Sequence, residues 1–245
     1  MDIEYPDMRR EVAPDVVRHV DTSDGREGLI SYSRLNEANA EEAIREQVGY
    51  FESIGQNFEW KLYDYDRPSD LKERLTAYGF LVEEAEAIMV QDLEDAPPLF
   101  WQPVSHQVQR ITDPGQVVDV LSVEQQVWQE DFSWLGNYLG ENLRRYPEQM
   151  SVYVAYVDGK PASAAWTYFP EHSQFASLWG GSTVSSFRGQ GLYTALLAVR
   201  AQEAKERQVR YLTVDASPMS RPILEKFGFE KIAYSYPCKW KHKLQ

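Results

Sequence analysis

The chain has a single cysteine, Cys238, among its 245 residues. One thiol cannot form an internal disulfide, and it leaves no cysteine-based metal site. The four histidines are scattered along the chain without the paired spacing of a zinc site. We therefore expect no bound metal, and a cytoplasmic location.

Long apolar runs and an excess of positive charge are also missing. No segment approaches the run of about 18 apolar residues that a membrane span needs, and the acidic N-terminus has no apolar core of a secretory signal. The 38 acidic and 25 basic residues give a net charge of −13. Nucleic-acid binding needs lysines and arginines that displace counterions, so we expect neither a nucleic acid nor a membrane as partner. Acidic charge favours a cationic amine or basic peptide as substrate, although solubility is the simpler explanation.

A short glycine-containing loop is the most informative feature that is present. An apolar run, Phe175–Val184, ends at a loop with Arg188, Gly189 and Gly191, and a helical pattern begins at Leu192. The first turn of a helix has unpaired N–H groups and partial positive charge, which suit an anion such as a pyrophosphate. Glycines allow phosphates close to the backbone. An ordinary strand-to-helix turn explains the loop alone equally well, and the patterns of a P-loop or a dinucleotide fingerprint are not met.

A second pattern follows the helix. We expect a strand over Val209–Asp215, and then a short helix that Ser217 caps, with Pro218 at its first position. Gly228 stands where a helix C-cap belongs, and Phe229 opens another strand.

Together the two patterns resemble the GNAT superfamily of N-acetyltransferases. The acetyl-CoA motif of that family reads Arg/Gln-x-x-Gly-x-Gly/Ala; Arg188 and Gly191 match it, whereas Tyr193 stands where a small residue is usual. The later family motif, a helix that ends in Gly-Phe, is met at residues 224–229. The resemblance extends from about His106 to the C-terminus. It implies an α/β (α+β) fold with a mixed central sheet flanked by helices, and acetyl-CoA as co-substrate.

The resemblance also implies which residues contact the cofactor. The loop would hold the pyrophosphate, the end of the preceding strand would pair with the pantetheine arm, and a serine stands where an asparagine often contacts the cofactor. These residues are Thr183, Val184, Arg188, Gly189, Gln190, Gly191, Leu192, Tyr193, Thr194 and Ser217.

The usual proton donor to the departing thiolate is missing. In many family members a tyrosine precedes the Glu-Lys-x-Gly-Phe segment, but here this position is Leu224, which cannot donate a proton. A thiol has a pKa near 8.5, so water can protonate the thiolate near neutrality. Tyr193 is the one nearby phenol that could replace the missing acid.

Direct attack on a thioester requires a neutral amine. An alkyl amine has a pKa near 10.4, so its deprotonation at pH 7 costs about 4.6 kcal/mol, and a base usually removes the proton. The acidic candidates are Glu130 and Asp131, between two predicted helices, and Glu171; His172 lies next to the latter. All four are also typical of a solvated loop. Ser182, near the loop, is not basic enough.

An internal repeat changes the domain organisation. Residues 60–80 align without a gap on residues 209–229, so that Leu75 falls on Leu224 and Gly79 on Gly228. We interpret residues 1–98 as a degenerate, structural half-copy of the fold and residues 99–245 as the acetyl-CoA-binding domain. Two prolines, Pro97 and Pro98, mark the boundary.

The first copy lacks the chemistry of the second. In place of the glycine loop it has residues 39–42, which include Glu41 and Glu42. Two carboxylates at a helix N-terminus suit its dipole but repel a pyrophosphate. Before that helix we expect only two strands and a turn at Ser23–Glu27.

Two functions from different classes remain. The first is an acetyl-CoA-dependent N-acetyltransferase that transfers the acetyl group to a primary amine of a small molecule or peptide. The second is a non-catalytic acyl-CoA-binding or interaction protein, which Leu224 suggests. The intact glycine loop favours the enzyme. Whether the chain forms a homodimer stays open.

Overall fold

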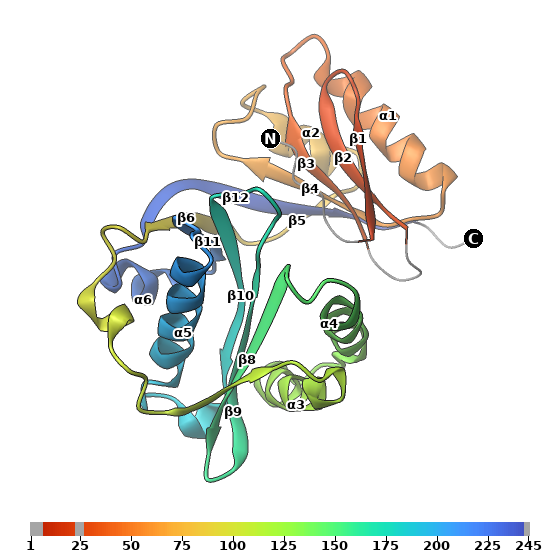
Figure 1. Ribbon diagram of the computed structural model, residues 1–245. Coiled ribbons are helices and arrows are strands. Elements are labelled where there is room, and N and C mark those ends of the chain that lie inside the picture. Colours follow the sequence, from red (N-terminus) through yellow and green to blue (C-terminus); the bar gives the residue numbers. More distant parts are fainter. Residues whose placement is uncertain (1–6, 23–26, 243–245) are drawn as a thin grey trace. The chain divides into compact units, whose positions relative to one another are not determined.

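The computed structural model describes residues 7–22 and 27–242 and divides into two compact units. The first unit comprises residues 1–89, 215–223 and 231–245, and the second comprises residues 90–214 and 224–230. C-terminal segments therefore belong to the first unit, whereas the boundary expected at residue 98 placed them all in the second domain. Figure 1 shows the elements of each unit.

A twisted sheet backed by two helices forms the first unit. Its strand order is β1-β2-β3-β4-β12, in which β3 and β4 are parallel and the other neighbours are antiparallel. Phe51 of the long helix stacks on Phe58 of the sheet with 4.2 Å between ring centroids, beside the fully buried Trp60. The elements are β1 (Met8–Val12), β2 (Val16–Asp21), β3 (Gly28–Ser33), α1 (Ala40–Ser53), β4 (Phe58–Tyr63), α2 (Leu71–Ala77), β5 (Leu81–Val82), and β12 (Glu230–Trp240), of which only the first residue belongs to the second unit.

The second unit has the order β11-β10-β9-β8-β7, with β10 and β11 parallel and the remaining pairs antiparallel. This is the mixed sheet that the sequence predicted. The elements are β7 (Gln107–Ile111), α3 (Val117–Trp128), α4 (Ser133–Arg145), β8 (Met150–Val157), β9 (Lys160–Tyr168), β10 (Phe175–Thr183), α5 (Leu192–Glu206) and β11 (Tyr211–Ala216). The strand β6 (Glu86–Asp92) and the helix α6 (Arg221–Lys226) are divided between the two units, and the last two residues of β11 belong to the first unit.

Helices cover both faces of this sheet (Figure 1). Val152 and Val154 of β8 belong to the apolar core beneath α3 and α4, whereas Tyr153 and Ala155 belong to a separate core with Leu196 of α5. The alternation follows from the two-residue period of a strand, which sends successive side chains to opposite faces. None of the helices in the described ranges is both long and apolar enough to cross a membrane.

Three details differ from the sequence-based expectation. Three strands, not two, precede α1, and most of the expected turn at Ser23–Glu27 lies outside the described residues. The helix α6 begins at Arg221, so Pro218 is not its first residue. Ser217 instead closes the preceding turn, where its carbonyl accepts a hydrogen bond from Arg221 N at 2.9 Å. The expected C-cap at Gly228 is confirmed by its φ of +87°.

Two glycine-to-alanine substitutions in the first unit should have opposite effects on stability. In Gly28→Ala the new Cβ would lie 2.2 Å from Cε1 of Phe51, a fully buried ring that cannot move aside, so we expect a loss of about 1–3 kcal/mol. In Gly49→Ala the Cβ meets nothing within 4 Å on the helix α1, and helix propensity predicts a gain of up to about 1 kcal/mol.

Urea unfolding of both variants, followed by circular dichroism, measures these changes. Equal stability of the two variants would contradict the packing of α1 on β3.

Candidate functional site

The predicted anion-binding loop joins β10 to α5 as the sequence indicates. β10 ends at Thr183, a short 3-10 turn covers Ser185–Phe187, and α5 starts at Leu192. Gly189 and Gly191 have φ values of +76° and +81°, which lie in the left-handed region where glycine carries no steric cost.

The N-terminus of α5 presents donors and no competing acid. The N–H groups of Leu192, Tyr193 and Thr194 belong to the first turn, where no helix carbonyl is available to them. No acidic residue lies in that turn. Partial positive charge is therefore left for an external anion, and the open backbone at Gly189, where an added Cβ would meet nothing within 4 Å, leaves room for one.

Two side chains hold the loop in shape. Arg188 Nε donates to the carbonyl oxygen of Thr183 at 3.1 Å, which ties the loop to the end of the strand. His106 Nε2 lies 2.7 Å from the carbonyl oxygen of Gln190. A carbonyl can only accept, so the Nε2 nitrogen carries the proton in this bond. Sequence reasoning missed His106, which is 84 residues from its partner.

A β-bulge interrupts β10 just before the loop. The pairing with β9 shifts register between Gly180 and Ser182, and Gly180 and Gly181 have φ values of +70° and +90°. An added Cβ on Gly181 would lie 2.9 Å from the ring of Tyr193. The bulge thus places the start of α5 against the strand, and bulges commonly re-aim side chains next to a functional site.

Tyr193, in the first turn of α5, is half-buried, and its ring lies against Gly181 of the bulge. Burial raises the pKa of its phenol, and the nearby guanidinium of Arg200 acts weakly in the opposite direction. The phenol is therefore protonated at neutral pH and can act as a donor.

Val184 already uses both of its main-chain polar groups. Its N–H donates to the carbonyl of Ala162 at 2.9 Å, and its carbonyl accepts from Phe187 N at 2.9 Å. The hydroxyl of Thr183 lies 2.8 Å from that of Ser163. Pairing of Val184 with a pantetheine arm would require an exchange of these partners.

The family comparison agrees with this geometry. Residues 122–239 match the family model described as an acetyltransferase (GNAT) domain. This segment, slightly less than half of the chain, is therefore similar to GNAT acetyltransferase domains. No curated protein matches the chain in sequence at a significant level.

Solved structures show the same fold over nearly the whole chain. A GCN5-related N-acetyltransferase from Kribbella flavida has a TM-score of 0.70 at 16% identity, with 95% of this chain and 89% of that chain covered. A functionally unknown conserved protein from Staphylococcus epidermidis has a TM-score of 0.68 at 11% identity, with coverages of 98% and 96%. A tandem GNAT protein from the clavulanic acid biosynthesis pathway has a TM-score of 0.63 at 12% identity, with coverages of 99% and 86%. At these identities the solved structures show that the chain shares their fold.

The two carboxylates predicted as bases lie on the exposed link between α3 and α4. Asp131 Oδ1 accepts hydrogen bonds from Ser133 N at 2.9 Å and from Ser133 Oγ at 2.5 Å, so it stabilises the start of α4. These bonds lower the pKa of Asp131, which makes it a weaker base. Glu130 is exposed, and Glu171 accepts from Gln149 Nε2 at 2.9 Å.

Two predicted positions lie apart from the chemistry of the loop. Leu224 is completely buried and serves the core, so no proton donor stands there. Ser217 falls among the residues of the first unit, where its Oγ accepts from Ser220 N at 3.3 Å. Within the described ranges, no group of three or more His, Cys, Asp and Glu side chains could hold a metal ion.

Glu124 is a functional candidate that sequence reasoning missed. Its side chain comes from α3, is 3% exposed, and accepts a hydrogen bond from Ser182 Oγ of the bulge at 2.9 Å. The signal was present in the sequence, because Glu124 interrupts an apolar helix face that includes Val120 and Val123.

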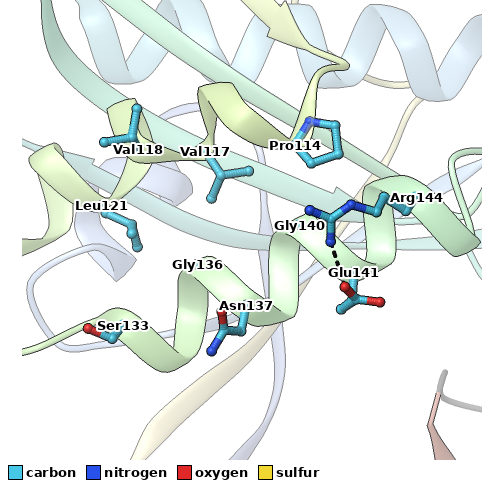
Figure 2. A pocket seen from close by; sticks show the side chains of 10 residues that line it. All are labelled: Pro114, Val117, Val118, Leu121, Ser133, Gly136, Asn137, Gly140, Glu141 and Arg144. Atoms are coloured by element: carbon cyan, nitrogen blue, oxygen red, sulfur yellow. Dashed lines mark hydrogen bonds and ion pairs between the residues drawn. The ribbon is translucent and has the colours of Figure 1, made fainter.

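The groove in Figure 2 belongs to helix packing rather than to the GNAT loop. It runs between α3 and α4, and an ion pair of 2.5 Å joins Arg144 to Glu141 at its edge. Gly136 lies close to Leu121 there, since an added Cβ would come within 2.8 Å of the leucine side chain. The small residue lets the two helices approach.

Removal of the His106 side chain should loosen the loop. In His106→Ala the carbonyl of Gln190 loses its hydrogen bond, which is worth about 1 kcal/mol, so we expect roughly fivefold faster amide exchange over residues 188–194. Hydrogen–deuterium exchange by mass spectrometry measures this change. His172→Ala is the matched control, because His172 is an exposed histidine outside the loop. Equal exchange in both variants would show that His106 does not hold the loop.

Proposed function

We propose that the protein is an acetyl-CoA-dependent N-acetyltransferase that acts on a primary amine of a small molecule or peptide. The observation that carries this proposal is the start of α5, where two glycines with positive φ expose the first-turn N–H groups and no acid competes for them. In a GNAT domain such a helix start suits the pyrophosphate of CoA. Incubation with acetyl-CoA and a panel of amines, followed by mass spectrometry of the products, tests the proposal.

Each part of the loop has a role in this proposal. The N–H groups from Gly189 to Thr194 bind the pyrophosphate, Arg188 adds guanidinium donors, and Thr183 and Val184 face the pantetheine arm. Bound acetyl-CoA supplies an acetyl group that is activated as a thioester. Tyr193, whose ring contacts the bulge, donates a proton to the departing sulfur in place of the tyrosine that Leu224 replaces.

A non-catalytic acyl-CoA-binding protein is the second candidate. The buried Leu224 favours it, because a core leucine cannot protonate a thiolate. The amine panel separates the two functions, since the second predicts CoA binding without any acetylated product.

We also propose that residues 1–98 are a degenerate, structural copy of the GNAT fold and that the cofactor binds only within residues 99–245. Similarity to a tandem GNAT protein supports this organisation. The first turn of α1 carries Glu41 and Glu42, and Arg74 lies 3.5 Å from Glu41. The helix start is thus already balanced within the chain. A cytoplasmic location remains a prediction.

Substitution of Gly191 by glutamate should abolish tight binding of acetyl-CoA. The new side chain would strain the left-handed backbone and place a carboxylate beside the pyrophosphate, so we expect an affinity loss of at least about tenfold. Gly159→Glu is the matched control, because Gly159 has a similar φ of +72° but lies in the β8–β9 hairpin. Titration calorimetry should give one site per chain in the wild type and in Gly159→Glu. Two sites, or unchanged binding by Gly191→Glu, would refute the assignment.

Removal of the Tyr193 hydroxyl should slow turnover without weakening cofactor binding. For Tyr193→Phe we expect kcat to fall about a hundredfold, as is typical for loss of a general acid, with the Kd of acetyl-CoA unchanged. Tyr211→Phe, a phenol stacked on Phe175, serves as control. If kcat of Tyr193→Phe stays within twofold of the wild type, water protonates the thiolate instead.

A further inference from the structure

The Glu124 carboxyl group is buried without a full set of hydrogen-bond partners. Its Oε2 accepts from Ser182 Oγ at 2.9 Å and from Trp128 Nε1 at 3.0 Å. Its Oε1 is also buried, and no residue in the described part of the chain bonds to it. A buried, half-satisfied carboxyl group is costly to keep. The site where it lies therefore suggests a function.

Ser182 connects this carboxyl group to the predicted reaction centre. It ends the bulge of β10 and directly precedes Thr183, beside the segment proposed to hold the pantetheine arm. Ser182 is partly exposed, whereas Glu124 is buried, so a molecule in the site reaches the hydroxyl and not the carboxylate. The hydroxyl donates to Glu124 and lies 3.2 Å from Trp128 Nε1. A hydroxyl has two acceptor positions, so one is left for an N–H of a substrate.

We propose that Ser182 and Glu124 form a proton relay that deprotonates a primary alkylammonium substrate. The inference rests on the proposed acetyl transfer. Ser182 is the catalytic residue: its Oγ takes a proton from the ammonium group while its own proton passes to Glu124 Oε2. Glu124 is a positioning residue that acts through Ser182 and stores the proton.

The protons and electron pairs of the proposed acetyl transfer balance. The neutral amine nitrogen uses its lone pair to bond to the acetyl carbon, and the C–S bond breaks so that its electron pair leaves with sulfur. The thiolate gains one proton, from Tyr193 or water, and the new amide nitrogen loses one to solvent. Glu124 releases its stored proton to solvent through Ser182, and Tyr193, where it is the donor, takes up one proton from solvent. Both groups then have their starting protonation states, and one proton is released per acetyl group transferred.

The electrostatic environment supports this role. Burial raises the pKa of Glu124, and the hydrogen bonds from Ser182 and Trp128 offset only part of that effect. No charged group of the described residues contributes to this shift from α4, β9 or β10, the elements around it. A carboxylate with a raised pKa is a stronger base than an ordinary one. Glu130 and Asp131 have no comparable burial.

The raised pKa also predicts the sign of the stability effect. A carboxyl group with a higher pKa in the folded state binds its proton more tightly there, so its contribution to stability falls as pH rises through that pKa. Glu124→Gln removes this cost and keeps the size of the side chain. The raised pKa therefore predicts an unchanged or higher Tm for Glu124→Gln at pH 8.

Steady-state kinetics of the full chain tests the relay with the best amine of the panel. We expect Ser182→Ala and Glu124→Gln each to lower kcat about a hundredfold, and the double variant to be no slower than the slower single variant. Ser182→Thr keeps the hydroxyl and should retain most activity. In the wild type, kcat/KM should rise with pH through an ionisation above the ordinary carboxyl range. In Glu124→Gln this ionisation should be absent. The control Glu141→Gln changes an exposed carboxylate on α4 and should stay within twofold of the wild type.

A fluorescence titration tests the relay without turnover. The indole N–H of Trp128 donates a hydrogen bond to Glu124, so the fluorescence of Trp128 should change with pH as the Glu124 carboxyl group ionises. Glu124→Gln should not show this change. Butylammonium chloride should lower the midpoint by about one pH unit, because a nearby cation favours the carboxylate. Butanol, its neutral analogue, should not.

The outcomes separate the two proposals. If the wild type acetylates no amine, the proposed function is wrong. If the wild type acetylates an amine but Glu124→Gln keeps wild-type kinetics, the relay is wrong. The relay is also wrong if kcat falls in Asp131→Asn and not in Glu124→Gln. A fluorescence transition that butylammonium does not move also overturns the relay.

Discussion

The attachment of α5 to the sheet of its own unit is the constraint on which the candidate site depends. Glu203 of this helix accepts hydrogen bonds from Ser151 Oγ at 2.6 Å and Tyr153 OH at 3.0 Å of β8, and Arg207 Nη2 lies 2.8 Å from it. Removal of one partner from a buried charged network typically costs about 3–5 kcal/mol. These contacts oppose a shift of the helix along the sheet. They therefore hold the N–H groups at the start of α5 in place relative to the end of β10.

The same helix also holds the bulge in place. Arg200, which is 2% exposed, donates from Nη1 to the carbonyl of Trp179 at 3.3 Å, immediately before the bulge. Because α5 contacts both the loop and the bulge, it fixes the position of the loop glycines relative to the Ser182 hydroxyl. The half-satisfied carboxyl of Glu124 lies at the other side of that hydroxyl. Local costs of this kind are commonly retained where function requires them.

Sequence reasoning predicted the region around the loop well because its elements follow regular patterns. The apolar run at residues 175–184 is the strand β10, the helix α5 begins at Leu192 as expected, and two helices flank Glu130 and Asp131. It missed what depends on long-range contact: Glu124 is 58 residues from Ser182. The strand β1 was also missed, since its charged residues, such as Arg9 and Glu11, pair with one another on a strand at the end of the sheet order and hide the alternation.

The first turns of α1 and α5 differ in how the positive end of the helix dipole is compensated. Each leaves first-turn N–H groups without helix partners and carries partial positive charge. In α1, Glu41 and Glu42 supply negative charge from within the chain, and the preceding Asn39 has a φ of −110°, not the positive φ of a glycine turn. In α5, the first turn has no acid and Gly191 opens the backbone. Of the two, only α5 leaves its positive end uncompensated. An external anion can therefore be stabilised electrostatically at the start of α5, whereas the start of α1 is already stabilised by the negative charge of its own side chains.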